Sequence, residues 1–159
     1  MIKAIAVDMD GTFLNSQSTF DRPLFEKVYA QLQAKDVEFV VASGNPIYQL
    51  VEKRFPKEAD GMAFVAENGV ELIDRGQEIY CGQFTKEQVE TLVAFFRSIP
   101  GGHLIISGRH HAFAFADEDP LFVKRVQPHY IHMQQINSLA DIDAVSYTHL
   151  RAHETLANI

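Results

Sequence analysis

Two aspartates, Asp8 and Asp10, follow an apolar segment, residues 2–7, and are themselves followed by Gly11 and Thr12. An apolar run of this kind is typical of a buried parallel strand. Side chains two residues apart in a strand project to the same side, so the two carboxylates would point into one small space. A bound cation or a proton would offset their repulsion there. Gly11 would let the backbone turn sharply after them.

This pair of carboxylates has the groups needed to transfer a phosphoryl group from a monoester. Asp8 could attack phosphorus in line and form an aspartyl-phosphate. A carboxylate approaches a phosphate dianion only with a cation between them, so the reaction needs Mg²⁺. Asp10 could protonate the leaving alkoxide and then take a proton from the hydrolytic water. We place Thr12 among the substrate-binding residues, because its hydroxyl can hydrogen-bond and order the turn.

A second polar turn, Ser43-Gly44-Asn45-Pro46, follows the β-branched segment 37–42. Ligands of open α/β sheets bind at the carboxyl ends of the strands. We therefore expect the Ser43 hydroxyl and the Gly44 N–H to hold phosphate oxygens. Asn45 suits the N-cap of a helix and Pro46 its first turn, which would place the positive end of a helix dipole nearby.

The aspartate turn has two other interpretations. Asp and Gly are ordinary turn residues, so the segment could be a strand that ends in an acidic turn. The polar turn at a second strand end favours a site instead. A calcium-binding EF-hand loop needs Gly at its sixth position, whereas Gly11 is fourth counting from Asp8, and this spacing excludes that loop.

The elements that must position these residues alternate along the first part of the chain. Apolar periodicity predicts a helix over 21–35, a strand over 37–42, a helix from Pro46 and a strand over 62–66. This order of strand and helix is typical of an α/β fold, with a parallel sheet and crossover helices.

The pattern then becomes antiparallel α+β. A hairpin is predicted over 70–81 around a turn at 74–77. The rest of this part is predicted as a helix behind the capping box Thr85/Gln88, strands over 103–106 and 112–116, a helix from Asp119-Pro120, and a strand over 130–136. We place a boundary after residue 83, between residues 1–83 and 84–144.

Composition narrows the classes of partner. The net charge of −7 argues against nucleic acid and anionic membranes. Cys81 is the only cysteine, which excludes an internal disulfide and suits a structural thiol in a reducing, cytoplasmic compartment. The five histidines between 103 and 132 lack the helical spacing or cysteine company of a zinc motif, so we interpret them as ordinary polar side chains.

Three segments resemble the haloacid dehalogenase-like hydrolases. Asp8-Met9-Asp10-Gly11-Thr12 resembles their motif I, and Val40-Val41-Ala42-Ser43-Gly44 resembles their motif II. Ala66-Glu67-Asn68-Gly69-Val70 resembles a stretch of the Cof-type branch. The resemblance covers about residues 1–143. It implies the N-terminal part of a Rossmann-like core, followed by the first part of a C2-type α+β cap.

The resemblance also implies roles for individual residues. Asp8 would be the nucleophile and Asp10 the acid/base, with Mg²⁺ on the Asp8 side chain and the Asp10 carbonyl. Phosphate would contact the Met9 backbone, Ser43 and Gly44. The implied substrates are small phosphorylated metabolites, foremost sugar phosphates. A phosphate- or sugar-phosphate-binding module without turnover stays open as an alternative, and the oligomeric state is left open.

The family's motif III lysine and its motif IV, Gly-Asp-x-x-Asn-Asp, do not occur after the cap segment. Without them the chain would be an inactive, C-terminally truncated fragment. The resemblance places the motif I strand centrally in the sheet, so here that strand would be a bare edge. Such an edge, with exposed apolar surface, would make the chain unstable or prone to aggregate.

The last segment has mixed polarity and no clean period, and it fits a further cap strand poorly. Eleven consecutive residues, Val145 to Thr155, match a translation of a transposase adapter used in DNA library preparation. We therefore interpret residues 145–159 as a non-native, adapter-derived tail. An ordinary helix around 150–156 is the alternative. His149 and His153 are spaced i, i+4, but we assign them no metal because they lie in this adapter-derived tail.

Overall fold

The computed structural model describes residues 1–142 and the backbone of 147–153. Contacts divide the chain into two compact units, Met1–Cys81 and Gly82–Ile159. The division falls just before the boundary proposed after residue 83. No helix in the described part of the chain is both long and apolar enough to span a membrane.

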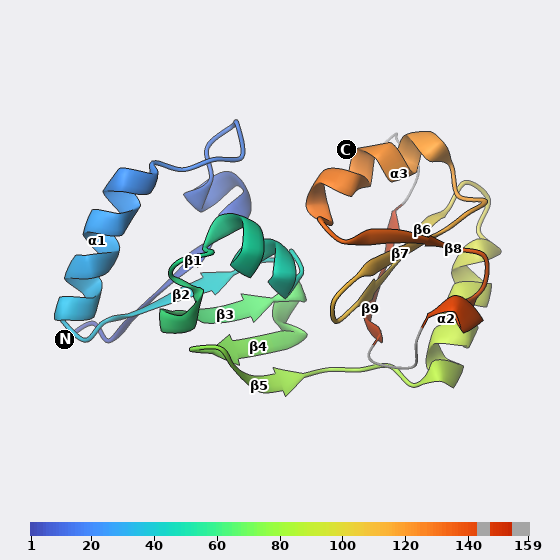
Figure 1. Ribbon diagram of the computed structural model, residues 1–159. Coiled ribbons are helices and arrows are strands. Elements are labelled where there is room, and N and C mark those ends of the chain that lie inside the picture. The colour runs from blue at the N-terminus through green and yellow to red at the C-terminus, as the bar shows by residue number, and fades with distance from the viewer. Residues whose placement is uncertain (143–146, 154–159) are drawn as a thin grey trace. The chain divides into compact units, whose positions relative to one another are not determined.

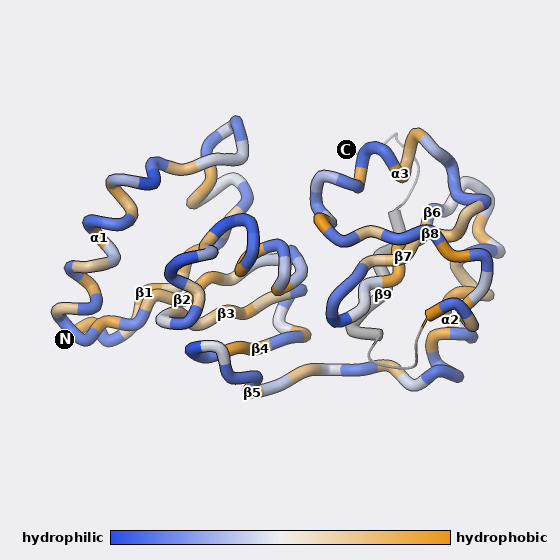
Figure 2. The backbone as a smooth tube through the Cα atoms, viewed as in Figure 1, coloured by the Kyte–Doolittle hydropathy of each residue, from blue (hydrophilic) through white to orange (hydrophobic). Residues whose placement is uncertain are grey.

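The first unit holds a five-stranded sheet whose strand order follows the sequence (Figure 1). Its strands are β1 (Ala4–Asp8), β2 (Glu38–Ala42), β3 (Ala63–Ala66), β4 (Glu71–Asp74) and β5 (Gln77–Cys81). Strands β1, β2 and β3 pair in parallel, and β4 and β5 continue the sheet in antiparallel fashion. Figure 2 shows apolar segments along β1 to β3 and a hydrophilic turn between β4 and β5. The mixed α/β fold expected from the sequence is confirmed.

Helix α1 (Arg22–Ala34) starts where the sequence predicts a start. The Asp21 side chain accepts a hydrogen bond from the Leu24 N–H at 2.9 Å, and Pro23 stands in the first turn. Phe25 and Tyr29 of α1 are buried against Phe39 of β2. The ring centroids of contacting pairs among these three residues and Phe55 lie 5.4–6.3 Å apart. Aromatic packing thus fixes α1 beside the sheet, and the two strands that carry the polar turns are held by this core.

The hairpin turn has the geometry expected of a two-residue connection. Arg75 and Gly76 both have positive φ, 48° and 76°, and Asp74 pairs with Gln77. Positive φ at both central residues is typical of the type I′ turn, which matches the twist of paired strands. The predicted hairpin is confirmed.

The second unit holds a four-stranded sheet in the order β8-β7-β6-β9. Its elements are α2 (Lys86–Arg97), β6 (His103–Gly108), β7 (Ala112–Phe115), α3 (Pro120–Val126), β8 (Met133–Ile136) and β9 (Tyr147–His153). Short 3₁₀ turns occupy Ala59–Gly61 and Glu67–Gly69 in the first unit, and Gln127–His129 and Leu139–Asp141 in the second. Strands β7 and β8 are parallel, so the sheet is mixed rather than wholly antiparallel.

Both faces of this sheet are covered. Val89 and Val93 of α2 pack with Leu104 and Ile106, whereas Ile105, between them, packs with α3 on the other face. Alternate residues of a strand point to opposite faces, which explains why β6 is apolar without a polar side. The capping box that starts α2 is present as predicted, with Thr85 and Gln88 bonded reciprocally.

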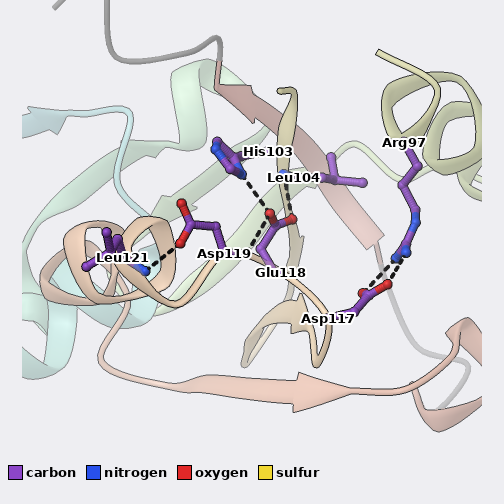
Figure 3. A network of polar contacts seen from close by, with 7 residues as sticks. All are labelled: Arg97, His103, Leu104, Asp117, Glu118, Asp119 and Leu121. Atoms are coloured by element: carbon purple, nitrogen blue, oxygen red, sulfur yellow. Dashed lines mark hydrogen bonds and ion pairs between the residues drawn. The ribbon is translucent and has the colours of Figure 1, made fainter. Parts of the chain in front are cut away.

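Polar contacts link the segment just before α3 to β6 and to α2 (Figure 3). The Glu118 carboxylate lies 2.7 Å from His103 Nδ1 and accepts from the Leu104 N–H at 3.2 Å. The His103 ring stacks on Phe122, with centroids 4.5 Å apart. The Arg97 guanidinium donates two hydrogen bonds to the Asp117 carboxylate.

The last strand contradicts one expectation. We expected no cap strand after residue 144, yet β9 pairs antiparallel with β6 from His103↔His153 to Gly108↔Tyr147. Strand pairing uses backbone N–H and C=O groups that every non-proline residue carries, so it does not require a regular side-chain pattern. The alternative of a helix around 150–156 is wrong for residues 150–153, which lie in β9. The adapter origin of residues 145–159 stays a prediction, and 143–146 and 154–159 lie outside the described residues.

Candidate functional site

The two polar turns leave the sheet side by side. Asp8, the last residue of β1, pairs in parallel register with Ala42, the last residue of β2. Ala42 directly precedes Ser43. The parallel pairing of β1 and β2 therefore brings Asp8 and Ser43 to the same edge of the sheet, where α/β folds bind ligands.

The loop after β1 is built by an alternation of buried and exposed residues. Met9 is fully buried, whereas Asp8 and Asp10 on either side of it are exposed. Met9 thus anchors the loop in the core, which leaves both carboxylates accessible. Thr12 is exposed in the same loop, and the Leu14 N–H closes the loop on the Met9 carbonyl at 2.9 Å.

Gly11 supplies the sharp turn that the sequence predicts. Asp10 has φ −80° and ψ 120°, and Gly11 has φ 77° and ψ 1°. These are the angles of a type II turn, whose third residue needs the left-handed region. A Cβ built on Gly11 would meet no atom within 4 Å, so conformation rather than space selects glycine here.

Backbone bonds tie the Ser43 turn to the end of β3. The Ser43 N–H donates to the Val65 carbonyl at 2.9 Å, and the Asn68 N–H donates to the Ser43 carbonyl at 3.1 Å. The Glu67 N–H donates to the Asn45 carbonyl at 3.1 Å. These bonds join the ends of β2 and β3 around Ser43, which is buried.

Asn45 joins the two polar turns. Its side-chain Nδ2 donates to Asp10 Oδ2 at 3.0 Å and to Ser43 Oγ at 3.1 Å. Its backbone N–H donates to the same Ser43 Oγ at 3.1 Å. Asn45 is only 6% exposed. The sequence predicted Asn45 as a helix cap and missed this link, because a contact between residues 35 positions apart leaves no local signal.

The helix expected after Pro46 is present, but only Ile47 and Tyr48 of it are α-helical. A helical segment begins at Ile47, and Gln49–Arg54 form a π-helical turn in which the Phe55 N–H donates to the Leu50 carbonyl at 2.9 Å. The wider π turn accompanies complete burial of Phe55 in the aromatic core. Tertiary packing here overrides the α-helical periodicity of Ile47, Leu50 and Val51.

The loop after β3 adopts an unusual backbone that the sequence did not predict. Glu67, Asn68 and Gly69 have φ of 52°, 60° and 91°, so three consecutive residues are left-handed. Residues other than glycine pay about 1–2 kcal/mol each for this conformation. The bonds from Glu67 and Asn68 to the Ser43–Asn45 segment hold the loop in place. Strain of this kind concentrates at functional sites.

The donor atoms at the loop after β1 suit Mg²⁺. The Asp8 carboxylate and the Asp10 main-chain carbonyl are hard oxygen ligands, and Mg²⁺ commonly uses one or two carboxylates, substrate phosphate and waters. Among the described residues, neither aspartate belongs to a cluster of three possible metal ligands. Glu71, Glu78 and Cys81 form such a cluster on the hairpin, because the antiparallel register places Glu71 opposite Cys81.

Comparisons with known proteins identify the family. The sequence model of the haloacid dehalogenase-like hydrolase family matches residues 5–157. The chain is 34% identical over 146 residues to 5-amino-6-(5-phospho-D-ribitylamino)uracil phosphatase YbjI of Escherichia coli K12, with 92% of this chain and 54% of that protein covered. This chain belongs to the haloacid dehalogenase-like hydrolase family. It spans about half the length of the curated relative that it matches.

Solved structures share the fold. SMU.1108c from Streptococcus mutans UA159 superposes with a TM-score of 0.83 and 33% identity, over 90% of this chain and 54% of that one. The subclass IIB sugar phosphatase BT4131 superposes with a TM-score of 0.63 over 84% of this chain and 52% of that one. At 19% identity, the second likeness bears on the fold alone.

Proposed function

We propose that this chain carries the nucleophile half of the active site of a Mg²⁺-dependent phosphatase that acts through an aspartyl-phosphate. The observation that most supports this is the Asn45 Nδ2 contact with Asp10 Oδ2 at 3.0 Å, which brings the aspartate loop against the Ser43 turn. A carboxylate nucleophile, a second carboxylate and phosphate-holding donors thereby meet at one edge of the sheet.

The proposed reaction assigns a role to each of these residues. An oxygen of Asp8 attacks phosphorus and forms the new O–P bond, while Asp10 gives its proton to the leaving oxygen as the old P–O bond breaks. Asp10 then takes a proton from water, which attacks the phosphorus of the aspartyl-phosphate. The bond between Asp8 and phosphorus breaks, which releases phosphate and restores the Asp8 carboxylate. The Ser43 hydroxyl and the Gly44 N–H hold phosphate oxygens. Mg²⁺ on Asp8 and the Asp10 carbonyl would neutralise charge between carboxylate and phosphate.

The proposed substrates are small phosphorylated metabolites, with sugar phosphates foremost. Two observations support this class. The relative from Escherichia coli is named for a phosphorylated ribitylamino compound. The net charge of −7 disfavours polyanionic substrates such as nucleic acid.

The test is phosphate release by the protein expressed from its complete gene, against a panel of sugar phosphates. We expect Asp8→Asn to abolish turnover and EDTA to stop it reversibly. Asp36→Asn is the matched control, because Asp36 lies before β2 and its exposed side chain pairs with Lys3 at 3.4 Å. Turnover that survives Asp8→Asn would overturn the mechanism. Binding of phosphate without hydrolysis would favour the non-catalytic module.

A further inference from the structure

We propose that Asn45 is a positioning residue that sets both the oxygen through which Asp10 transfers its proton and the direction of the Ser43 hydroxyl. The proposal rests on the proposed phosphatase function and adds a residue to it. Asn45 touches neither reacting atom, and it acts through the two side chains that do.

The orientation of the Asn45 carboxamide is fixed by its neighbours. Asp10 Oδ2 is the acceptor of this contact, so the nitrogen of the carboxamide and not its oxygen faces it. The Nδ2 group has two hydrogens and two acceptors within reach, Asp10 Oδ2 at 3.0 Å and Ser43 Oγ at 3.1 Å. Both hydrogens are used, and the 6% exposure of Asn45 leaves water little room to replace either acceptor.

The same bonds fix the Ser43 hydroxyl. A hydroxyl oxygen offers two lone pairs and one hydrogen. Ser43 Oγ accepts from the Asn45 backbone N–H and from Asn45 Nδ2, each at 3.1 Å. With both lone pairs occupied, the hydroxyl can only donate in its remaining direction. A phosphate dianion bears acceptors alone, so a hydroxyl held as a donor is the form that binds it.

The bond to Asp10 separates the two oxygens of that carboxyl group. Oδ2 receives the Asn45 N–H, so the proton that Asp10 carries as an acid belongs on Oδ1. The loop bearing Asp10 is exposed and turns at Gly11, and the Asn45 contact restrains the carboxyl plane there. A positioned acid or base contributes roughly 10²–10⁴-fold to rate, and a misaligned one loses much of this.

Leaving groups of different acidity isolate this effect. A sugar phosphate releases a basic alkoxide that needs a proton, whereas 4-nitrophenyl phosphate releases a stable phenolate that needs little help. The value of kcat/KM covers steps up to the first irreversible one, which is transfer to Asp8 with loss of the leaving group. Phosphate contacts from Ser43 are common to both substrates and cancel in the ratio of the two kcat/KM values.

The experiment compares Asn45→Ala and Asn45→Asp in the protein from the complete gene. We expect the ratio of kcat/KM for a sugar phosphate to that for 4-nitrophenyl phosphate to fall by about tenfold or more in both variants. The inhibition constant of inorganic phosphate should rise several-fold as the Ser43 hydroxyl loses its orientation. Asn15→Ala is the control, because Asn15 accepts bonds from Gln17 and Thr19 within a surface loop, and it should change neither quantity.

A third measurement tests whether the effect passes through Asp10. In an Asp10→Asn background, Asn45→Ala should not lower the ratio further, because the acid is already gone. If Asn45→Ala yields little folded protein, Asn45→Asp keeps the side-chain size and serves the same test. An unchanged ratio, whether kcat/KM falls equally on both substrates or on neither, would overturn the role of Asn45. It would leave the proposed phosphatase function standing. A wild-type protein inactive on every phosphate would overturn the proposed function and this inference with it.

Discussion

Met9 separates Asp8 from Asp10 in the loop that follows β1. Its side chain is fully buried, whereas both neighbours are exposed. That the two carboxylates point into one space stays a prediction from the two-residue spacing of a strand. The link through Asn45 could not be predicted in the same way, since it depends on the parallel register of β1 and β2.

Gly11 gives a prediction at the scale of one residue. Gly11→Ala should lower the free energy of unfolding by about 1–2 kcal/mol, because alanine resists the left-handed region. No atom would clash with the new Cβ, so the cost is conformational. Urea denaturation measures it. Gly11→Asn should cost less, since asparagine tolerates left-handed φ, and equal stability of the alanine variant would contradict the turn geometry.

At the scale of elements, helix starts were the most predictable features. Asp21, Thr85 and Asp119 each accept a hydrogen bond from the first turn of a helix. Such caps can be read from sequence because the bond joins neighbouring residues. The π turn at Gln49–Arg54 depends on packing, and the strand β9 depends on pairing with distant residues. No local sequence pattern predicts either of them.

The capping box of α2 carries a prediction about stability. Thr85→Ala removes the acceptor for the Gln88 N–H and should cost about 1 kcal/mol in the free energy of unfolding. Thr91→Ala is the matched control: Thr91 bonds the Glu87 carbonyl inside the helix and caps nothing. Thermal unfolding followed by circular dichroism compares them, and similar losses in both variants would argue against the cap.

Asp141 gives a prediction about how the stability of the second unit depends on pH. Hydrogen bonds from the backbone N–H groups of Ser138 and Asn137 hold the pKa of the Asp141 carboxyl below its ordinary value. A lowered folded-state pKa stabilises the fold above the unfolded-state pKa of about 3.9, and that stabilisation is lost as pH falls through the folded-state value. The difference in melting temperature between wild type and Asp141→Asn should therefore shrink below about pH 4. A difference that is constant from pH 7 to pH 3 would contradict this.

At the scale of the molecule, the strand that bears the candidate nucleophile is also an edge strand of its sheet. β1 pairs only with β2 in the described part of the chain, and Ile5 is 37% exposed. The sequence predicted this bare edge from its resemblance to a family in which the strand is central, and the structure confirms it. Unpaired backbone groups beside apolar side chains promote association between chains.

We therefore predict that this 159-residue chain self-associates through β1. Ile5→Lys should reduce association, because a charged residue blocks edge pairing. Leu24→Lys is the control, since Leu24 is 57% exposed but sits on α1, whose backbone is already bonded. Light scattering with size-exclusion chromatography gives the masses. A monomeric wild type, or an equal effect of both variants, would argue against the edge.

The most direct test of the account is a search for phosphate bound covalently to Asp8. The protein from the complete gene is mixed with a sugar phosphate and Mg²⁺, quenched in acid during turnover, and analysed by peptide mass spectrometry. We expect one phosphoryl group on the peptide that contains Asp8, and none in Asp8→Asn. Steady hydrolysis of the substrate with no phosphoryl group on that peptide, or with one on another residue, would contradict it.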